Sequence, residues 1–101
     1  MQTISVQELK SRKEAGETLY ILDVREPAEY AEVNMGALLI PLGKIMNHEI
    51  DGIEDWKEHE VIVHCRSGAR SATACMVLEQ MGFSNTKNLI GGILAWKELG
   101  M

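Results

Sequence analysis

Residues 64–71 read His64-Cys65-Arg66-Ser67-Gly68-Ala69-Arg70-Ser71. They follow the short β-branched run Val61-Ile62-Val63, which predicts a strand buried on both faces. Beyond them, apolar residues recur at roughly helical spacing as far as Met81, with Ser71 able to cap the start and Gly82 able to end the helix. We therefore predict a helix over residues 71–81, and a loop that joins the carboxyl end of a buried strand to its amino end.

Cys65 lies in that loop, where the surroundings favour a negative charge. Backbone N–H groups at a helix start lack partners within the helix, and the aligned peptide dipoles add about half a positive charge. Arg66 and Arg70 add two further positive charges, and Gly68 allows a tight turn. Such surroundings lower a cysteine pKa from about 8.5 to roughly 3.5–7.5. We predict that Cys65 is an ionised, partly exposed nucleophile that attacks sulfur and holds it as a persulfide.

Strand-like and helix-like segments alternate along the rest of the chain. The patterns predict strands over residues 3–4, 19–25, 38–40, 61–63 and 86–89, and helices over 5–14, 26–30, 43–49, 53–58, 71–81 and 93–99. This alternation predicts an α/β fold with parallel strands, helices on both faces, and ligands just beyond the carboxyl ends of the strands. Because no repeat or linker interrupts the pattern, we expect residues 1–101 to form a single domain.

Composition narrows the classes of function. The 101 residues are 46% hydrophobic with a net charge of −5, and the scattered Lys and Arg residues give no nucleic-acid footprint. No apolar stretch approaches the roughly 18 residues that a membrane span needs, and residues 1–5 lack a secretion signal, so we expect a cytoplasmic protein. Cys65 and Cys75 have neither a metal-type nor a disulfide-type spacing, which predicts reduced thiols and no metal.

Several other side chains have simpler structural explanations. Cys75 lies on the apolar stripe of its helix, which favours packing over a role as resolving thiol. His64 is expected to be structural because adjacent strand residues point to opposite faces. Asp23 and Arg25 end the second predicted strand, where a hydrogen-bonded ion pair is favoured and a contribution to the shape of the site stays open. His48 and His59 are expected on the surface. Trp56 and Trp96 are expected to cover the core, and Trp96 is also a candidate for one wall of the pocket.

Successive strings along nearly the whole chain resemble the signatures of rhodanese-like sulfurtransferases. These strings are Asp23-Val24-Arg25-Glu26-Pro27-Ala28-Glu29-Tyr30, Gly36-Ala37, Ile40-Pro41-Leu42, Cys65-Arg66-Ser67-Gly68-Ala69-Arg70-Ser71 and Gly91-Gly92-Ile93-Leu94-Ala95-Trp96. The resemblance implies a three-layer α/β/α fold with a five-stranded, mostly parallel sheet. It implies that Cys65 carries the persulfide, that Arg66, Ser67, Gly68, Ala69 and Arg70 form the substrate-binding loop, and that Arg70 closes this loop.

The same resemblance implies the chemistry of the partners. Sulfane sulfur would come from thiosulfate, polysulfide or a protein persulfide and pass to cyanide or to a small or protein thiol, without metal or organic cofactor. A monomer or weak dimer is expected. The chain departs from the family over residues 31–37, where a Gly-His pair is missing and the loop is one residue shorter.

Two alternative functions stay open at this stage. A cysteine-dependent phosphatase or arsenate reductase places its arginine six positions after the cysteine, whereas Arg70 follows Cys65 by five and Ser71 takes the sixth position. A non-catalytic module could instead bind or sense persulfide. Turnover distinguishes this second alternative, because a sensor takes up one sulfur and stops.

Overall fold

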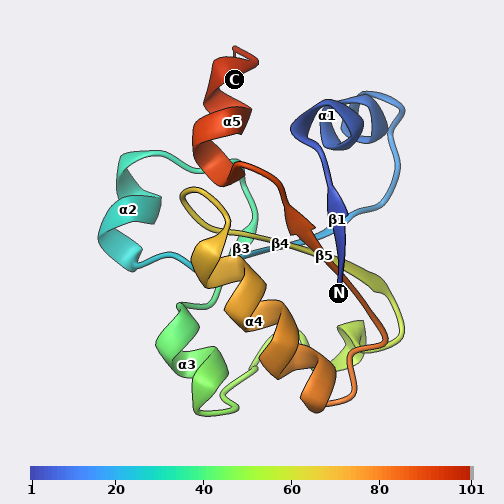
Figure 1. Cartoon of the computed structure of the whole chain (residues 1–101), viewed down its shortest axis with the longest axis vertical. Helices are drawn as coiled ribbons and strands as arrows, with labels where there is room; N and C mark the ends of the chain where they lie inside the picture. Colours follow the sequence, from blue (N-terminus) through green and yellow to red (C-terminus); the bar gives the residue numbers. More distant parts are fainter. Residues whose placement is uncertain (101) are drawn as a thin grey trace.

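One five-stranded sheet organises the computed structural model, which describes residues 1–100 (Figure 1). The strands are β1 (Gln2–Ile4), β2 (Tyr20–Asp23), β3 (Leu38–Leu39), β4 (Glu60–His64) and β5 (Asn85–Leu89). The helices are α1 (Val6–Glu14), α2 (Pro27–Glu32), α3 (Leu42–Met46), α4 (Ala69–Gln80) and α5 (Gly92–Glu98), with a 3-10 turn at Glu54–Trp56. The strand order is β1-β5-β4-β2-β3 and all four pairings are parallel. The expected α/β fold is confirmed, and its sheet is wholly parallel.

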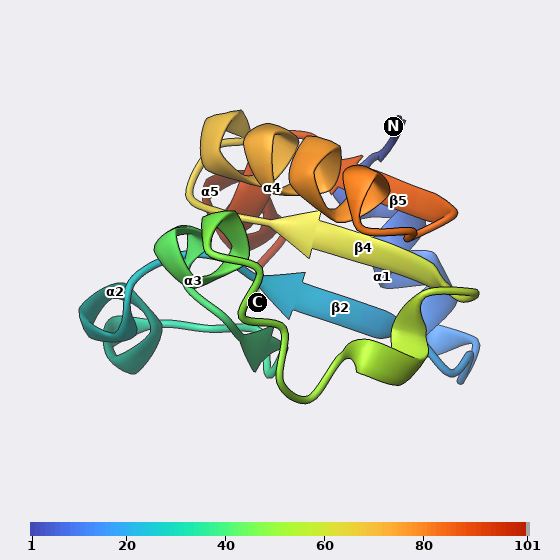
Figure 2. The same ribbon diagram turned by 90° about the horizontal axis from the view of Figure 1, so that it is seen from below.

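Helices cover both faces of the sheet, which makes the three expected layers (Figures 1 and 2). The alternation of side chains along β4 explains this arrangement, since Val61 and Val63 face one core while Ile62 faces the other. The first core packs α3 and α4 on the sheet through Ile45, Ala74, Cys75 and Leu78. The second packs α1 and α5 through Val6, Leu9, Ile93 and Trp96.

Most predicted boundaries lie within two residues of the observed ones, and the exceptions have local causes. The second strand ends at Asp23 and not at Arg25, because the Arg25 N–H donates to the Asp23 carboxylate at 3.0 Å and not to a neighbouring strand. The helix predicted over 43–49 ends at Met46, and His48 lies beyond it with a positive φ of 61°. The segment predicted as a helix over 53–58 is a single 3-10 turn.

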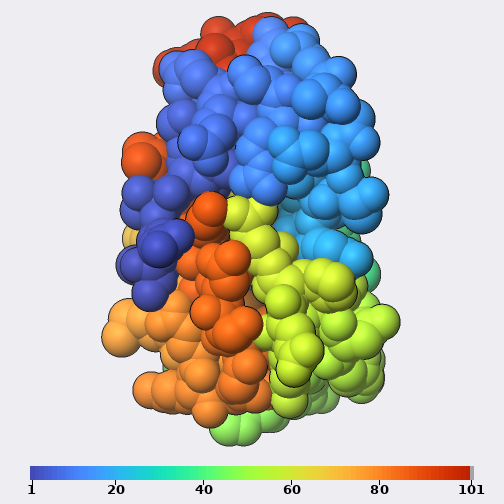
Figure 3. Space-filling model, turned by 90° about the vertical axis from the view of Figure 1, so that its right-hand side faces the viewer, coloured from blue at the N-terminus to red at the C-terminus, as the bar shows by residue number. Residues whose placement is uncertain are grey.

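The amino end of the sheet is fastened by contacts far from Cys65. The segment before β4 and the turn that leads into β5 lie side by side on one face of the molecule (Figure 3), where the Ser84 N–H donates to Lys57 O at 3.0 Å. Glu60 forms ion pairs with Arg12 of α1 and Lys87 of β5. These contacts hold β4 at the end opposite the cysteine loop. No helix within residues 1–100 has the length and apolar character of a membrane span.

Candidate active site

Cys65 directly follows β4, and the chain turns within three residues into α4. Gly68 occupies the N-cap position with a φ of 121°, a backbone conformation that favours glycine. Its N–H donates to the Cys65 sulfur at 3.1 Å. The predicted strand, loop and helix are therefore present. The helix, however, begins at Ala69 and not at Ser71. The expectation that Ser71 caps the helix is wrong, because Ser71 lies inside the first turn.

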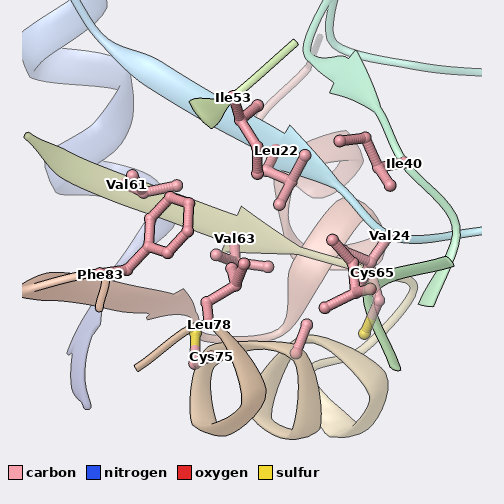
Figure 4. Packing of buried hydrophobic residues seen from close by; sticks show 12 residues of the cluster. Leu22, Val24, Ile40, Ile53, Val61, Val63, Cys65, Cys75, Leu78 and Phe83 are labelled. Carbon is pink, nitrogen blue, oxygen red and sulfur yellow. The ribbon is translucent and has the colours of Figure 1, made fainter. Parts of the chain in front are cut away.

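The Cys65 side chain is buried, with only 1% of the residue exposed, so the prediction of a partly exposed sulfur is wrong. It packs in the core between the sheet and α4, beside Val24 (Figure 4). Burial raises the pKa of the Cys65 thiol, but hydrogen bonds from the Ser71 hydroxyl and from backbone N–H groups of Ser71, Gly68 and Ser67 outweigh it and leave the pKa below its ordinary value. The loop therefore favours the thiolate, as predicted, although the nearest stabilising groups are donors and not the arginines.

The start of α5 holds the other side of the loop. The Ile93 N–H donates to Cys65 O at 2.9 Å and the Leu94 N–H donates to Arg66 O at 3.2 Å. This contact is close because Gly92 has no side chain. A Cβ placed there would lie 2.5 Å from Cys65 O and 2.6 Å from Arg66 O. Gly92 thus permits the backbone of α5 to bind the backbone of the cysteine loop.

Asp23 and Arg25 form a buried ion pair at the end of β2, as the sequence favoured. The Arg25 Nε donates to Asp23 Oδ1 at 3.0 Å and one terminal nitrogen donates to Oδ2 at 2.7 Å. That same nitrogen donates to Val33 O at 2.7 Å. Arg25 also lines a hollow beside the loop, so its paired guanidinium shapes the wall of the site.

Local hydrogen bonds hold the segment 31–37, where the sequence departs from the family signature. The Asn34 Nδ2 donates to Tyr30 O at 2.9 Å, and its Oδ1 accepts from the Gly36 N–H at 2.9 Å. The Tyr30 hydroxyl donates to Ala37 O at 2.7 Å. Asn34 therefore supplies the turn in this segment, and the Val33 carbonyl oxygen accepts from Arg25.

Arg70 is held by an acidic partner on α2. Its two terminal nitrogens donate to the two carboxylate oxygens of Glu29 at 2.7 and 2.9 Å. The arginine expected to close the loop therefore connects the first turn of α4 to α2, and Glu29 compensates much of its charge. This leaves Arg66 as the loop arginine whose exposed side chain faces the adjacent hollow.

The Glu29–Arg70 pair predicts an acid-sensitive contribution to stability. Arg70, followed by the Glu26 N–H, lowers the pKa of Glu29 to about 2. A depressed carboxyl pKa stabilises the folded state above the unfolded value of about 4.3, and this contribution is lost as the pH falls through the folded value. Both side chains are about one-third exposed. Solvent therefore screens the pair, and we expect Glu29→Gln to lower the free energy of unfolding at pH 7 by only about 1 kcal/mol.

Urea unfolding of the wild type and of Glu29→Gln between pH 7 and pH 2 measures this effect. The difference between the two proteins should shrink across the acid range. Glu58→Gln, at an exposed position before β4, is the matched control and should differ little from wild type throughout. A difference for Glu29→Gln that stays constant down to pH 2 would contradict the ion-pair explanation.

A hollow of about 240 Å³ opens beside the cysteine loop. Its lining combines cationic, acidic and apolar side chains, namely Arg25, Glu29, Glu32, Val33, Arg66, Ile93, Leu94 and Lys97. Arg66, Leu94 and Lys97 are exposed, so the hollow is accessible to a substrate. A larger hollow of about 430 Å³ lies near the β2–β3 side of the sheet, between Lys13 and Trp56, and has no residue of the cysteine loop in its lining.

The remaining candidates have the structural roles that the sequence favoured. His64 is fully buried, and burial lowers its pKa, so it is a neutral core residue beside Asp23. Cys75 packs beside Leu78 (Figure 4), where burial raises its pKa to about 11. His48 and His59 are exposed. Trp96 belongs to the core under α1 and α5 and does not line the hollow.

Sequence reasoning missed four side chains that surround the loop: Ser71 as a contact of the sulfur, Asn88, Glu29 and Lys97. Asn88 carried a usable signal, because it is a polar residue near the carboxyl end of a strand predicted to lie in the same parallel sheet. Glu29 and Lys97 gave no such signal, since only the packing of α2 and α5 brings them to the loop. Within residues 1–100, no group of three or more His, Cys, Asp or Glu residues is arranged to bind a metal.

The fold and the loop together define a class of protein, a parallel α/β domain that presents a cysteine sulfur at a turn from strand to helix. The chain belongs to the rhodanese-like domain family, whose model matches residues 5–99. It is 38% identical to a sulfurtransferase of Allochromatium vinosum, over 97% of this chain and 90% of that protein. It is 39% identical to YtwF of Bacillus subtilis, over 96% of this chain and 91% of the relative.

A solved structure supports the same assignment. The rhodanese-like domain protein of Staphylococcus aureus superposes with a TM-score of 0.82 at 31% identity, covering 95% of this chain and 91% of the other. The resemblance inferred from the sequence is therefore confirmed, and the chain is a member of a sulfurtransferase family.

Proposed function

We propose that this protein transfers sulfane sulfur through a persulfide formed on Cys65. One observation carries the proposal: the Cys65 sulfur receives the Gly68 N–H at the turn between β4 and α4, where further donors lower its pKa. An anionic sulfur in that position is a nucleophile surrounded by preorganised donors. The same donors would stabilise the negative persulfide after the sulfur has been accepted.

The reaction has two balanced steps. The Cys65 thiolate attacks the outer sulfur of thiosulfate, a new S–S bond forms on the cysteine, and the donor S–S bond breaks so that sulfite leaves with its electron pair. An acceptor thiolate then attacks the terminal sulfur of the persulfide. The Cys65 thiolate is regenerated and the acceptor leaves as a persulfide. Polysulfide or a protein persulfide can replace thiosulfate as donor, and cyanide can replace the thiol as acceptor.

The anionic donor is expected to approach through the hollow beside the loop, where Arg66 and Lys97 supply positive charge. Arg66→Ala should therefore raise the KM for thiosulfate about tenfold, equivalent to about 1.4 kcal/mol of lost binding, with a smaller change in kcat. Steady-state kinetics with thiosulfate measure the change. Lys44→Ala removes the same charge from an exposed position on α3 and is the control. An equal rise in KM for both variants would mean that the loss of one positive charge alone causes the effect, and would contradict direct binding of thiosulfate by Arg66.

Turnover tests the proposal as a whole. Purified protein is given thiosulfate and a small thiol, and sulfite is counted per mole of protein. A transferase releases many equivalents, whereas a persulfide sensor releases one and stops. A single equivalent in the presence of several acceptor thiols would contradict the proposed activity and favour the sensing module. The phosphatase alternative has less support, because Arg70 follows Cys65 by five positions and is already bound to Glu29.

We place this activity in the cytoplasm, because Cys65 and Cys75 are both free thiols of the kind that persist in a reducing compartment. We further propose that residues 1–101 form one domain that needs no cofactor and acts as a monomer or weak dimer. The partner that follows from this chemistry is a sulfur donor and a thiol acceptor, either of which can be a small molecule or a protein.

A further inference from the structure

Asn88 of β5 contacts the cysteine loop at two points. Its Nδ2 donates to Gly68 O at 3.1 Å, and its Oδ1 lies 2.5 Å from the Ser71 hydroxyl oxygen. A carbonyl oxygen only accepts hydrogen bonds, so the nitrogen side of the Asn88 amide must face Gly68. The oxygen side is then directed at Ser71 and can only accept. This geometry fixes Asn88 as an acceptor for the proton of the Ser71 hydroxyl.

The Ser71 hydroxyl has one proton and three acceptors within reach. These are Asn88 Oδ1, Gly68 O at 3.2 Å and the Cys65 sulfur at 3.4 Å. Gly68 O already receives the Ala72 N–H at 3.1 Å and Asn88 Nδ2. The short contact to Asn88 therefore takes the proton in the resting thiol form. The lone pairs of the Ser71 oxygen then face Cys65 and can accept its S–H.

Ionisation of Cys65 reverses this preference. A thiolate no longer has a proton to donate, and a hydrogen bond to an anionic acceptor is about twice as strong as one between neutral groups. The hydroxyl proton then turns from Asn88 to the sulfur. We propose that Asn88 is a positioning residue that holds the Ser71 proton away from the resting Cys65 thiol and gives it up to the anionic sulfur.

The sign of one substitution separates this role from simple anchoring of the loop. In Asn88→Ala, the Ser71 hydroxyl loses its competing acceptor and is free to donate to the sulfur. The midpoint of Cys65 ionisation should then fall by about half to one pH unit. If Asn88 only anchored the loop through Gly68, its removal would loosen the donors around the sulfur and the midpoint would rise.

The experiment uses thiolate absorbance at 240 nm against pH, with each protein in a Cys75→Ala background and the matching Cys65→Ser protein subtracted. Ser71→Ala should raise the midpoint by about half to one pH unit. Adding Asn88→Ala to Ser71→Ala should leave the midpoint at the Ser71→Ala value. The proposal would be overturned if Asn88→Ala alone raised the midpoint of Cys65 ionisation. It would also be overturned if Asn88→Ala lowered the midpoint equally in the presence of Ser71 and in the Ser71→Ala background.

Asn88→Asp provides a second route if Asn88→Ala fails to fold. The Ser71 hydroxyl should continue to donate to the new carboxylate even when Cys65 is ionised. Adding Ser71→Ala to Asn88→Asp should therefore change the midpoint far less than Ser71→Ala does in the wild type. A full-sized rise would contradict the proposal. The other charged and titratable groups around the site are Arg66 of the loop, Arg70 with Glu29, Asp23 with Arg25, and His64. They are the same in every variant, so their effect on the midpoint cancels when two variants are compared.

The inference rests on the proposed function in treating Cys65 as the reacting group, but its test needs no sulfur donor. If the midpoints follow the predicted pattern and no sulfur transfer is found, the positioning role stands and the proposed function fails. If sulfur transfer is found and the midpoints of Cys65 ionisation do not move, the proposed function stands and the positioning role of Asn88 fails.

Discussion

Cys65→Ser is expected to lower sulfur transfer at least about a thousandfold, to the level of the reaction without enzyme. A serine hydroxyl does not ionise at neutral pH and forms no S–S bond, so both proposed steps lose their reacting atom. The replacement is nearly isosteric in a site that is 1% exposed, and the Gly68 N–H keeps an acceptor. The protein should therefore stay folded. Sulfite release from thiosulfate with a thiol acceptor measures the loss.

Cys75→Ala is the matched control, since it removes the other thiol of the chain. Cys75 is buried in the core under α4 and its pKa of about 11 keeps it protonated, so transfer should persist. If Cys65→Ser kept wild-type activity, the assignment of Cys65 would be wrong. If Cys75→Ala also abolished transfer while remaining folded, Cys75 would have to take part in the reaction, and a two-cysteine mechanism would replace the present one.

Gly92→Ala is expected to be the most damaging change outside the cysteine. The new Cβ would lie 2.5 and 2.6 Å from the carbonyl oxygens of Cys65 and Arg66, and the φ of +55° already disfavours a side chain. Backbone atoms cannot move aside without displacing the loop. We expect a loss of stability of about 3 kcal/mol and a large loss of transfer in the fraction that folds, because the loop can no longer present its N–H groups to the sulfur.

Gly43→Ala separates this clash from a general effect of replacing glycine. Gly43 lies in α3, has no positive φ and has open space where a Cβ would be built. Alanine also has the higher helix propensity, so this variant should be as stable as the wild type or slightly more so. Chemical denaturation of both variants, with sulfite release measured below the transition, makes the comparison. Near-wild-type stability and activity in Gly92→Ala would contradict the close backbone contact.

The core of the site could be predicted from sequence because it is local in the chain. The β-branched run before Cys65, the glycine at the turn and the apolar spacing after it are all within about twenty residues, and each has a direct physical meaning. The Gly91-Gly92 pair could be recognised as a family signature. The reason for Gly92, the close approach of α5 to the loop, depends on how two distant segments pack, and is evident only in the structure.

The errors also have physical causes. The expectation of a partly exposed sulfur fails because the loop sequence does not reveal that the Cys65 side chain points into the core between the sheet and α4, beside Val24. The ion pair of Arg70 could not be predicted, because Glu29 lies 41 positions away in the chain and accepts two of its N–H donors only once α2 and α4 have packed. The role of Arg70 in binding substrate stays a prediction. The residue type of Ser71 suits a helix cap, but Gly68 occupies the N-cap position.

Intact mass spectrometry tests the central claim most directly. The protein is incubated with thiosulfate alone, desalted, weighed, and then exposed to an acceptor thiol. We predict a gain equal to one sulfur atom, located on the peptide that contains Cys65, absent from Cys65→Ser and reversed by the acceptor. An unchanged mass with polysulfide as well as with thiosulfate, or a gain confined to Cys75, would contradict the claim that Cys65 carries the sulfur.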